Sequence, residues 1–401
     1  MAGLAGLALK KGFEVTGQDK SYFPPMSDQL KSLGIQENKT EKPISDLKKS
    51  DAIIIGNSQS RGNESVEYIL DNKLNYFSGP EWIKENILKD KYVFVVSGTH
   101  GKTTTTSMLI KILQENNKDP SFLVGGVYKE ENISYKYTNS DYFVIEGDEY
   151  DTSFFDKRAK FFHYKPNTLV INNLEYDHSD IFENLEQIKK QFHFLIRTMP
   201  SDSNIVYNDN DQNILDLLGM GCWAKKTHYK VINNIPNIFG DHNFMNASAA
   251  SAAASLIGIE EKNSLKALEK FSGVKRRLEL IENKKFIVYD DFAHHPTAIS
   301  SSIQAVRSIH PKKNIAVIFE IRSNSMISGT HEKNFIKSFL DINELYIYCE
   351  KEITWLDKNS NIKVYKDIEQ IIQKLNDNID NVDIVIVMSN GDTSEVLRKL
   401  K

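Results

Sequence analysis

The stretch KYVFVVSGTHGKTTTTSMLI, residues 91–110, decides the fold of this chain. Its first part, YVFVVS (92–97), is a run of β-branched and aromatic residues with the length of a buried strand. Beyond the polar residues 98–103, the apolar residues Met108, Leu109, Ile112 and Leu113 recur at helical spacing. The sequence therefore predicts a strand, a glycine-bearing turn and a helix in immediate succession.

The turn between this strand and this helix predicts a phosphate site. A glycine-bearing turn at a helix start leaves backbone N–H groups unpaired, and the helix dipole favours an anion there. Lys102 supplies a mobile positive charge for phosphate oxygens, and the Thr103 hydroxyl can ligate Mg²⁺. Only two residues separate Gly98 from Gly101, so the spacing differs from G-x-x-x-x-G-K-[ST]. The alternative is a tight structural turn.

The composition is that of a globular protein without membrane or nucleic-acid partners. A length of 401 residues suggests two or three domains. The net charge of −4 gives no reason to expect nucleic acid or an anionic membrane. Two cysteines without metal-ligand spacing suit a reducing compartment. We interpret the first residues, MAGLAGLALKKGF, as a helix packed on a sheet rather than a signal peptide, and expect a cytoplasmic protein.

The first 88 residues resemble a small α/β unit. Their patterns predict a helix at 2–11, a strand at 14–16, a loop at 22–26, a helix at 27–33 and a strand at 52–55. The last of these strands leads into the polar loop GNSQSRGN, residues 56–63. Open α/β sheets bind ligands at the carboxyl ends of their strands, so this loop is a candidate binding segment. An ordinary connector is the alternative.

An acidic segment follows the strand predicted at residues 141–146. Glu146, Asp148, Glu149 and Asp151 place four carboxylates within six residues. They would repel one another unless a positive group lay nearby, and a metal ion or a phosphate–Mg²⁺ complex is the natural partner. Glu146, at the strand tip, is placed like the acidic residue opposite a phosphate loop. A solvated acidic turn is the alternative.

The strand predicted at 168–174 ends at Glu175-Tyr176-Asp177-His178. His178 is either a further metal ligand or a structural residue oriented by its neighbours. A helix is predicted at 184–198. Its Lys189 and Lys190 either approach the site or solvate the outer face of the helix, and we favour the outer face.

The rest of the chain is also α/β. Asn243, at the start of a small-residue helix, carries the amide edge needed to recognise adenine. Residues 271–279 form a basic turn in which one arginine could reach a phosphate, or else an exposed hairpin. From residue 281, strands are predicted at 286–290, 315–319, 345–348 and 384–388, with helices between them and polar residues at their carboxyl ends. Alternating strands and helices make the whole chain α/β.

The motifs of this sequence resemble those of the Mur ligases, the ATP-dependent amide-forming enzymes of peptidoglycan synthesis. The resemblance covers nearly the whole chain and rests on six motifs in family order: SGTHGKTTTT, EGDEYD, NNLEYDH, GDHNFMNASAA, GVKRRLE and DDFAHHPTAI. Further segments are similar to the branch that recycles murein by joining the free tripeptide L-alanyl-γ-D-glutamyl-meso-diaminopimelate to UDP-N-acetylmuramate: YFPPMSDQL, IGNSQSRGN, SGPEW, DEYDTSFFDKRAKFFHYKP, FHFLIRTMP and RSNSM. The L-alanine-adding branch, which shares the ATP motifs, is the alternative within the family.

The resemblance implies three domains. They are a Rossmann-like UDP-sugar-binding domain (1–88), a central P-loop ATP-binding ligase domain (89–280) and a Rossmann-like C-terminal domain (281–401). The family normally begins with a strand and a G-x-x-G-[ST]-x-M loop that cradles the UDP diphosphate, and this chain starts at the position of that methionine. We therefore expect a truncated N-terminal domain, which leaves open a nucleotide-binding remnant without ligase activity.

The resemblance also implies roles for individual residues. Lys102, Glu146 and His178 would be catalytic; Thr103 and Glu146 would ligate one Mg²⁺ and His178 a second. The ATP ligands would be Gly98, Thr99, His100, Gly101, Lys102, Thr103, Thr104, Asn243 (adenine), Arg277 (phosphates) and Asp291 (ribose). Substrate contacts would be Asn57, Ser58, Ser60 and Arg61 for the UDP-sugar, and Arg322, Ser323 and Asn324 for the tripeptide.

Two further features depart from the family pattern. Many Mur ligases carry a carbamylated lysine near the second Mg²⁺. Its position in this chain stays open within the stretch Lys189, Lys190 and Gln191. The C-terminal sequence SNGDTSEVLRKL differs from the family's S-N-G-x-[FG]-x-G-[IL]-H, so that contact is expected to be lost.

Overall fold

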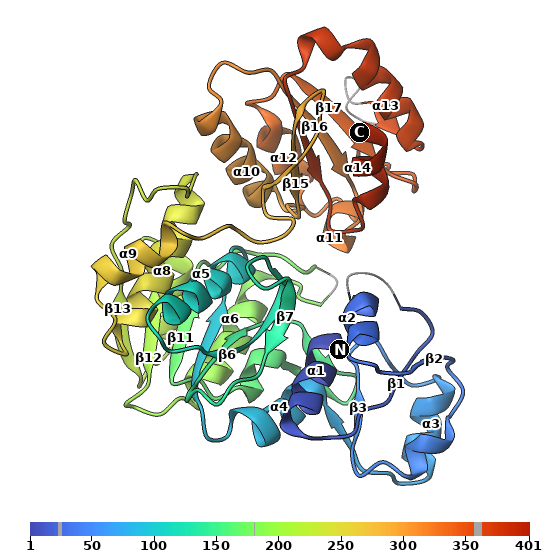
Figure 1. Cartoon of the computed structure of the whole chain (residues 1–401), viewed down its shortest axis with the longest axis vertical. Helices are drawn as coiled ribbons and strands as arrows, with labels where there is room; N and C mark the ends of the chain where they lie inside the picture. The colour runs from blue at the N-terminus through green and yellow to red at the C-terminus, as the bar shows by residue number, and fades with distance from the viewer. Residues whose placement is uncertain (23–25, 180, 357–362) are drawn as a thin grey trace. The chain divides into compact units, whose positions relative to one another are not determined.

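The structure, a computed structural model, describes residues 1–22, 26–179, 181–356 and 363–401 (Figure 1). The loop predicted at 22–26 therefore falls largely outside the described residues, as does part of the segment YFPPMSDQL. The chain divides into two compact units. The first comprises Met1–Glu175, Leu185–Lys230 and Asn246–Phe271, and the second Tyr176–Asn184, Val231–Met245 and Ser272–Lys401. Each unit has its own main sheet.

The first unit begins with short elements. They are α1 (Ala2–Lys11), β1 (Gly17–Asp19), α2 (Met26–Ser32), β2 (Glu37–Lys39), η1 (Ser45–Lys48), β3 (Ile53–Ile55), α3 (Glu64–Asp71), β4 (Tyr76–Ser78), α4 (Gly79–Ile83) and the π-helical turn η2 (Lys84–Leu88). Strands β1 and β2 form one parallel pair, and β3 and β4 form another.

Local sequence explains some of these boundaries. The helix predicted at 2–11 is confirmed, and Asn63 and Ser78 cap α3 and α4 through their side chains. The strand predicted at 14–16 is wrong, because the paired residues are Gly17–Asp19. The Asn38 side chain donates to the Gly17 carbonyl at 2.9 Å, so partner contacts rather than β-propensity place this strand.

The main sheet of the first unit holds the predicted phosphate loop. The elements along this part of the chain are β5 (Tyr92–Ser97), α5 (Lys102–Glu115), β6 (Ser121–Tyr128), β7 (Ile133–Lys136), β8 (Tyr142–Glu146), β9 (Asp151–Ser153), β10 (Asp156–Ala159), η3 (Lys160–His163), β11 (Thr168–Ile171), α6 (Leu185–Ile196), β12 (Asn204–Tyr207), α7 (Gln212–Gly219), β13 (Lys225–His228), α8 (Asp241–Ser255) and α9 (Glu261–Leu268). Strands β9 and β10 form a separate antiparallel pair, and the residues of α8 up to Met245 belong to the second unit. Among the described residues the strand order is β13-β12-β11-β5-β8-β6-β7.

Strand register brings three strand tips together. Strand β5 lies between β11 and β8 and is parallel to both. Ser97 pairs with Ile171 of β11, and Val96 pairs with Glu146 of β8. Because parallel strands end at the same edge, the segments that follow β5, β8 and β11 are neighbours. The buried side chains of Phe94, Val95 and Val96 fix this centre of the sheet.

The second unit is a sheet covered by helices on both faces (Figure 1). Its elements are β14 (Glu279–Ile281), β15 (Ile287–Asp291), α10 (Pro296–Ile309), β16 (Ile315–Glu320), α11 (Asn324–Ile327), α12 (Glu332–Phe335), η4 (Ile336–Phe339), β17 (Glu344–Tyr348), β18 (Val364–Tyr365), α13 (Ile368–Asp377), η5 (Ile379–Asn381), β19 (Ile384–Met388) and α14 (Ser394–Leu400). The strand order over the described residues is β14-β15-β19-β16-β17-β18, parallel except for β14 against β15.

Two cores hold this unit together. Side chains of α10, α12 and η4 pack on one face of the sheet, and those of α13 and α14 pack on the other. The strands predicted from residue 286 onward are confirmed to within one residue at each end. Over the part of the chain that the structure describes, no helix combines the length and apolar character that crossing a membrane requires.

Removing Phe319 tests the packing of this unit. Its side chain is fully buried, with ring centroids 5.6 and 5.5 Å from those of Phe335 and Phe339. We expect Phe319→Ala to lower the free energy of unfolding by about 3–5 kcal/mol, because it leaves a cavity. Leu340→Ala is the control, since Leu340 is 76% exposed and should change stability little. Equal effects of the two variants in urea unfolding would contradict this packing.

Candidate active site

Two asparagines after β11 hold the loop that follows β5. The backbone N–H of Thr99 donates to the Asn173 carbonyl at 3.2 Å, and that of His100 donates to Asn173 Oδ1 at 2.8 Å. Asn172 Nδ2 donates to the Thr105 hydroxyl at 2.9 Å. The prediction that the loop N–H groups are unpaired is therefore wrong for Thr99 and His100. The first turn of α5, which begins at Lys102, supplies the helix N-terminus.

Glycine is required at both ends of this loop. Gly98 has φ 129° and Gly101 has φ 79°, a backbone conformation that L side chains rarely adopt. A Cβ at Gly98 would lie 2.9 Å from the Asn173 carbonyl oxygen, and one at Gly101 would lie 2.3 Å from Asn246 Oδ1. The glycine spacing of the sequence is thus a consequence of close packing against the residues after β11 and in α8.

The ammonium group of Lys102 is held by four acceptors. Its Nζ lies 2.7 Å from the Gly98 carbonyl oxygen, 3.3 Å from that of Thr99 and 3.0 Å from each carboxylate oxygen of Glu149. Burial alone would lower the pKa of Lys102, but the carboxylates of Glu149, Asp148 and Glu146 more than offset burial and raise it. Lys102, whose side chain is 14% exposed, is therefore a largely buried cation at the carboxyl edge of the sheet.

Glu146 and Thr103 lie in direct contact, as a shared metal site requires. The Thr103 hydroxyl donates to Glu146 Oε1 at 3.1 Å, and the N–H of Gly125 donates to Glu146 Oε2 at 2.9 Å. Hydroxyl and carboxylate oxygens are ligands that Mg²⁺ accepts. The structure thus brings together three of the predicted residues, Lys102, Thr103 and Glu146, at the tips of β5 and β8.

Lysines that the sequence analysis did not identify neutralise the acidic segment. Lys160 Nζ lies 2.6 Å from Asp148 Oδ2, and Lys157 Nζ lies 2.7 Å from Asp151 Oδ2. Burial opposes ionisation of Asp148, yet Lys160 and Lys102 hold its pKa below the ordinary value. Part of the positive charge expected from a metal or phosphate is therefore supplied by the chain. The signal was the FDKRAK segment, whose lysines face the acidic residues across the β9–β10 hairpin.

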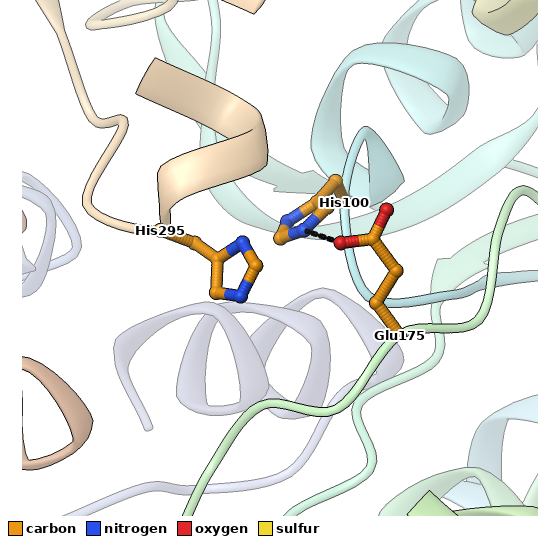
Figure 2. Close-up of side chains that lie close together, drawn as sticks. All are labelled: His100, Glu175 and His295. Atoms are coloured by element: carbon orange, nitrogen blue, oxygen red, sulfur yellow. Dashed lines mark ion pairs between the residues drawn. The ribbon is translucent and has the colours of Figure 1, made fainter. Parts of the chain in front are cut away.

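His100 lies against Glu175 at the same edge of the sheet. Figure 2 shows its ring pointing toward the carboxylate of Glu175, with Nε2 3.4 Å from Glu175 Oε2. The Thr99 hydroxyl donates to the Glu175 carbonyl at 3.1 Å, and the Glu175 N–H donates back to that hydroxyl at 2.8 Å. The residues after β11 therefore hold the phosphate loop from Thr99 onward, a role that the NNLE motif did not reveal by itself.

Three of the predicted ATP ligands, Asn243 for the adenine, Arg277 for the phosphates and Asp291 for the ribose, belong to the second unit. Asn243 donates from Nδ2 to the Phe239 carbonyl at 2.9 Å, and the Arg277 guanidinium lies 4.7 Å from the centroid of the Phe292 ring. Asp291 accepts the N–H groups of Leu278 at 2.7 Å and of Ala293 at 2.6 Å. Asp291 thereby ties the basic turn to the end of β15, and its ribose contact stays a prediction.

The predicted substrate contacts remain untested predictions. Arg61 pairs with Glu67 at 2.9 Å, and Asn57, Ser58 and Ser60 are exposed in the same loop. In the second unit, Arg322 is exposed with its NH1 3.7 Å from Glu320 Oε1. Ser323 caps α11 by accepting the Met326 N–H, and Asn324 is the first residue of that helix.

His178 also belongs to the second unit, so its relation to Thr103 and Glu146 stays a prediction. Its φ is 59°, in the left-handed region that non-glycine residues seldom occupy. The Asp177 carboxylate accepts the His178 N–H at 2.7 Å. Such a backbone conformation is often found at functional sites.

The lysines of α6 differ from expectation in one respect. Lys189 is buried, with Nζ 3.1 Å from Glu186 and 3.3 Å from Asp216, so the outer-face prediction is wrong for it. The two carboxylates provide the counter-charge that makes burial of this ammonium tolerable. Lys190 is exposed, as predicted. Gln191 accepts the Ala159 N–H at 3.1 Å, and none of the three is identified as a carbamylated residue.

The parallel sheet with a glycine-bearing loop before α5 places the chain among α/β proteins of the phosphate-loop type. The chain belongs to the Mur ligase family: residues 1–91 match its catalytic domain, 96–234 its middle domain and 276–391 its glutamate ligase domain. The expected three-domain family architecture is thereby confirmed.

Individual relatives refine this assignment. The UDP-N-acetylmuramate–L-alanyl-γ-D-glutamyl-meso-2,6-diaminoheptandioate ligase of Haemophilus influenzae is 36% identical over an alignment 441 positions long. The alignment covers 100% of this chain and 96% of the relative. The murein peptide ligase of Psychrobacter arcticus has a similar crystal structure, with TM-score 0.77 and 33% identity, covering 100% of this chain and 96% of that one. The UDP-N-acetylmuramate–L-alanine ligase of Clostridium acetobutylicum is 28% identical, covering 99% of this chain and 94% of the relative.

The buried Asp290 predicts a pH dependence of stability. Thr393 donates to both carboxylate oxygens at 3.0 Å and Arg276 Nε lies 3.6 Å away, but burial dominates and raises the pKa of Asp290 to about 6. The folded chain thus binds more protons than the unfolded chain between pH ~4 and ~6, so stability falls as pH rises through this range.

We expect Asp290→Asn to remove this fall, which amounts to about 3 kcal/mol at most. Urea unfolding of both proteins across pH 4–7 measures it as the difference between the two stability curves. Parallel curves for the wild type and the variant would contradict a raised pKa for Asp290.

Proposed function

We propose that this protein is an ATP-dependent ligase that joins L-alanyl-γ-D-glutamyl-meso-diaminopimelate to the lactyl carboxylate of UDP-N-acetylmuramate. The observation that carries the proposal is the 36% identity, along the whole chain, to a relative named for this reaction. The L-alanine ligase relative covers the same length at 28%. The paired Thr103 and Glu146 beside Lys102 support the ATP-dependent part of the assignment.

The reaction requires activation of a carboxylate. A carboxylate is a poor electrophile, so the muramate carboxylate first accepts the γ-phosphoryl group of ATP and becomes an acyl phosphate. The alanine amine of the tripeptide then attacks the acyl carbon, an amide bond forms, and phosphate leaves. The protein must therefore stabilise charge on a transferring phosphoryl group and exclude water from the acyl phosphate.

The residues of the first unit are suited to the phosphoryl step. The Lys102 ammonium faces the loop and would exchange part of its contacts with Gly98 and Glu149 for β- and γ-phosphate oxygens. The first turn of α5 offers N–H groups to the same phosphates. Thr103 and Glu146 would hold Mg²⁺ through oxygen atoms, as that ion prefers. Mg²⁺, when bound, neutralises charge on the phosphate oxygens.

The second unit would supply the remaining contacts. We assign Asn243 to the adenine, Arg277 to the phosphates and Asp291 to the ribose. His178 would ligate a second Mg²⁺, and Arg322, Ser323 and Asn324 would contact the tripeptide. Asn57, Ser58, Ser60 and Arg61 of the first unit would contact the UDP-sugar.

Replacement of Lys102 tests the phosphoryl step. We expect Lys102→Ala to lower kcat by ~10²–10³-fold or more, because it removes a preorganised positive charge from the transferring phosphoryl group. Lys111→Ala is the matched control, since Lys111 lies on the same helix but pairs with Glu115 at 2.9 Å. Phosphate release under saturating substrates measures both variants. Unchanged activity of Lys102→Ala would remove the phosphate-loop assignment.

A comparison of acceptors tests the choice of substrate. With UDP-N-acetylmuramate and ATP, the free tripeptide should give a higher kcat/KM for ADP formation than L-alanine does. A higher value with L-alanine would identify the L-alanine-adding reaction instead. ATP binding without UDP-N-acetylmuramate binding in calorimetry would indicate a nucleotide-binding remnant.

A further inference from the structure

Three buried side chains of the second unit come close together without being part of the site described above. They are Asp177 in the segment Tyr176–Asn184, His295 just before α10 (Figure 2) and His331 just before α12. One ligand atom of each lies within 4.8 Å of the other two, and the residues are only 4%, 7% and 9% exposed. Burial of three such polar groups is costly unless something binds them.

His331 and Asp177 are too far apart for a hydrogen bond. His331 Nε2 lies 3.8 Å from Asp177 Oδ1, and the described residues provide no hydrogen-bond partner for this buried nitrogen. Two ligands of one tetrahedral Zn²⁺, each at ~2.0–2.1 Å from the metal, lie roughly 3.3–3.4 Å apart. A shift of about half an ångström would therefore let both atoms bind one ion.

Asp177 is already oriented by its neighbours. The backbone N–H of His178 donates to Oδ1 at 2.7 Å, and the Ser325 hydroxyl donates to the same oxygen at 3.4 Å. These two donors hold the carboxylate in place before any metal binds, as the partners of a metal ligand do.

Metal binding would cost His295 one hydrogen bond. Its Nδ1 accepts the Thr297 N–H at 3.3 Å and caps α10. Binding a metal through Nε2 would place the proton on Nδ1 and break this long hydrogen bond. The His295 and His331 rings already meet edge to face, with centroids 4.4 Å apart.

We propose that Asp177, His295 and His331 form a site for Zn²⁺ or a similar divalent transition metal. Two imidazoles and one carboxylate suit Zn²⁺, whereas Mg²⁺ prefers oxygen ligands. The site would tie the segment Tyr176–Asn184 to the starts of α10 and α12. Three protein ligands leave a fourth position for water or for a substrate group. This inference rests on the geometry of the three side chains and does not depend on the proposed ligase activity.

Zinc titration of the full chain tests the site. Chelator-treated protein is titrated with Zn²⁺ in calorimetry at millimolar Mg²⁺, and Co²⁺ is then bound in its place to record visible absorption. We expect one Zn²⁺ per chain, at least tenfold weaker binding in His331→Ala and Asp177→Asn, and a four-coordinate Co²⁺ spectrum that both substitutions abolish. His331→Gln, which keeps the side-chain volume, should behave like His331→Ala if the loss is one of a ligand.

Controls separate this site from other histidines. His178→Ala should retain Zn²⁺ binding, because its imidazole is not part of the set, and so should His100→Ala and His310→Ala. Circular dichroism of each variant checks folding. Absence of Zn²⁺ binding at millimolar Mg²⁺, equal affinity in wild type and His331→Ala, or loss of binding in His178→Ala would each overturn the proposal.

Discussion

The contact between the Lys102 ammonium and the Glu149 carboxylate is the interaction around which the candidate site is built. Both groups are largely removed from solvent, and each would be costly to bury alone. The pair holds the Lys102 ammonium beside the loop that begins at Gly98, where a phosphate would bind. A bound phosphate can replace the Gly98 carbonyl as an acceptor of the Lys102 ammonium. Glu149 would keep part of its own contact with that ammonium.

The scaffold beneath this pair is rigid because three strands share one edge. Pairing of β5 with β8 sets Glu146 beside Val96, and pairing with β11 sets Asn172 and Asn173 beside the loop. Side chains on neighbouring tips can then be held within hydrogen-bond distance without long connections. Lys157 in β10 and Lys160 in η3 pair with Asp151 and Asp148 and so compensate part of the acidic charge.

Elements with strong local signals could be predicted from the sequence. The strand at 92–97, the helix after it and the strands of the second unit follow from apolar periodicity, and the rule that ligands gather at carboxyl strand ends pointed to Lys102, Thr103 and Glu146. What depends on tertiary partners could not be predicted. Three contacts join residues that are distant in sequence. They are the pairing of Gly17–Asp19 with Glu37–Lys39, the burial of Lys189 beside Asp216 and the hydrogen bond from the His100 N–H to Asn173.

The central claim is that this loop binds the phosphates of a magnesium nucleotide. A crystal structure with Mg²⁺ and a non-hydrolysable ATP analogue tests it most directly. The account predicts Lys102 Nζ at ~2.7–2.9 Å from β- and γ-phosphate oxygens, and Mg²⁺ at ~2.0–2.1 Å from the Thr103 hydroxyl and the Glu146 carboxylate. A nucleotide bound elsewhere, with Lys102 still held by Gly98 and Glu149 and no metal between Thr103 and Glu146, would contradict it.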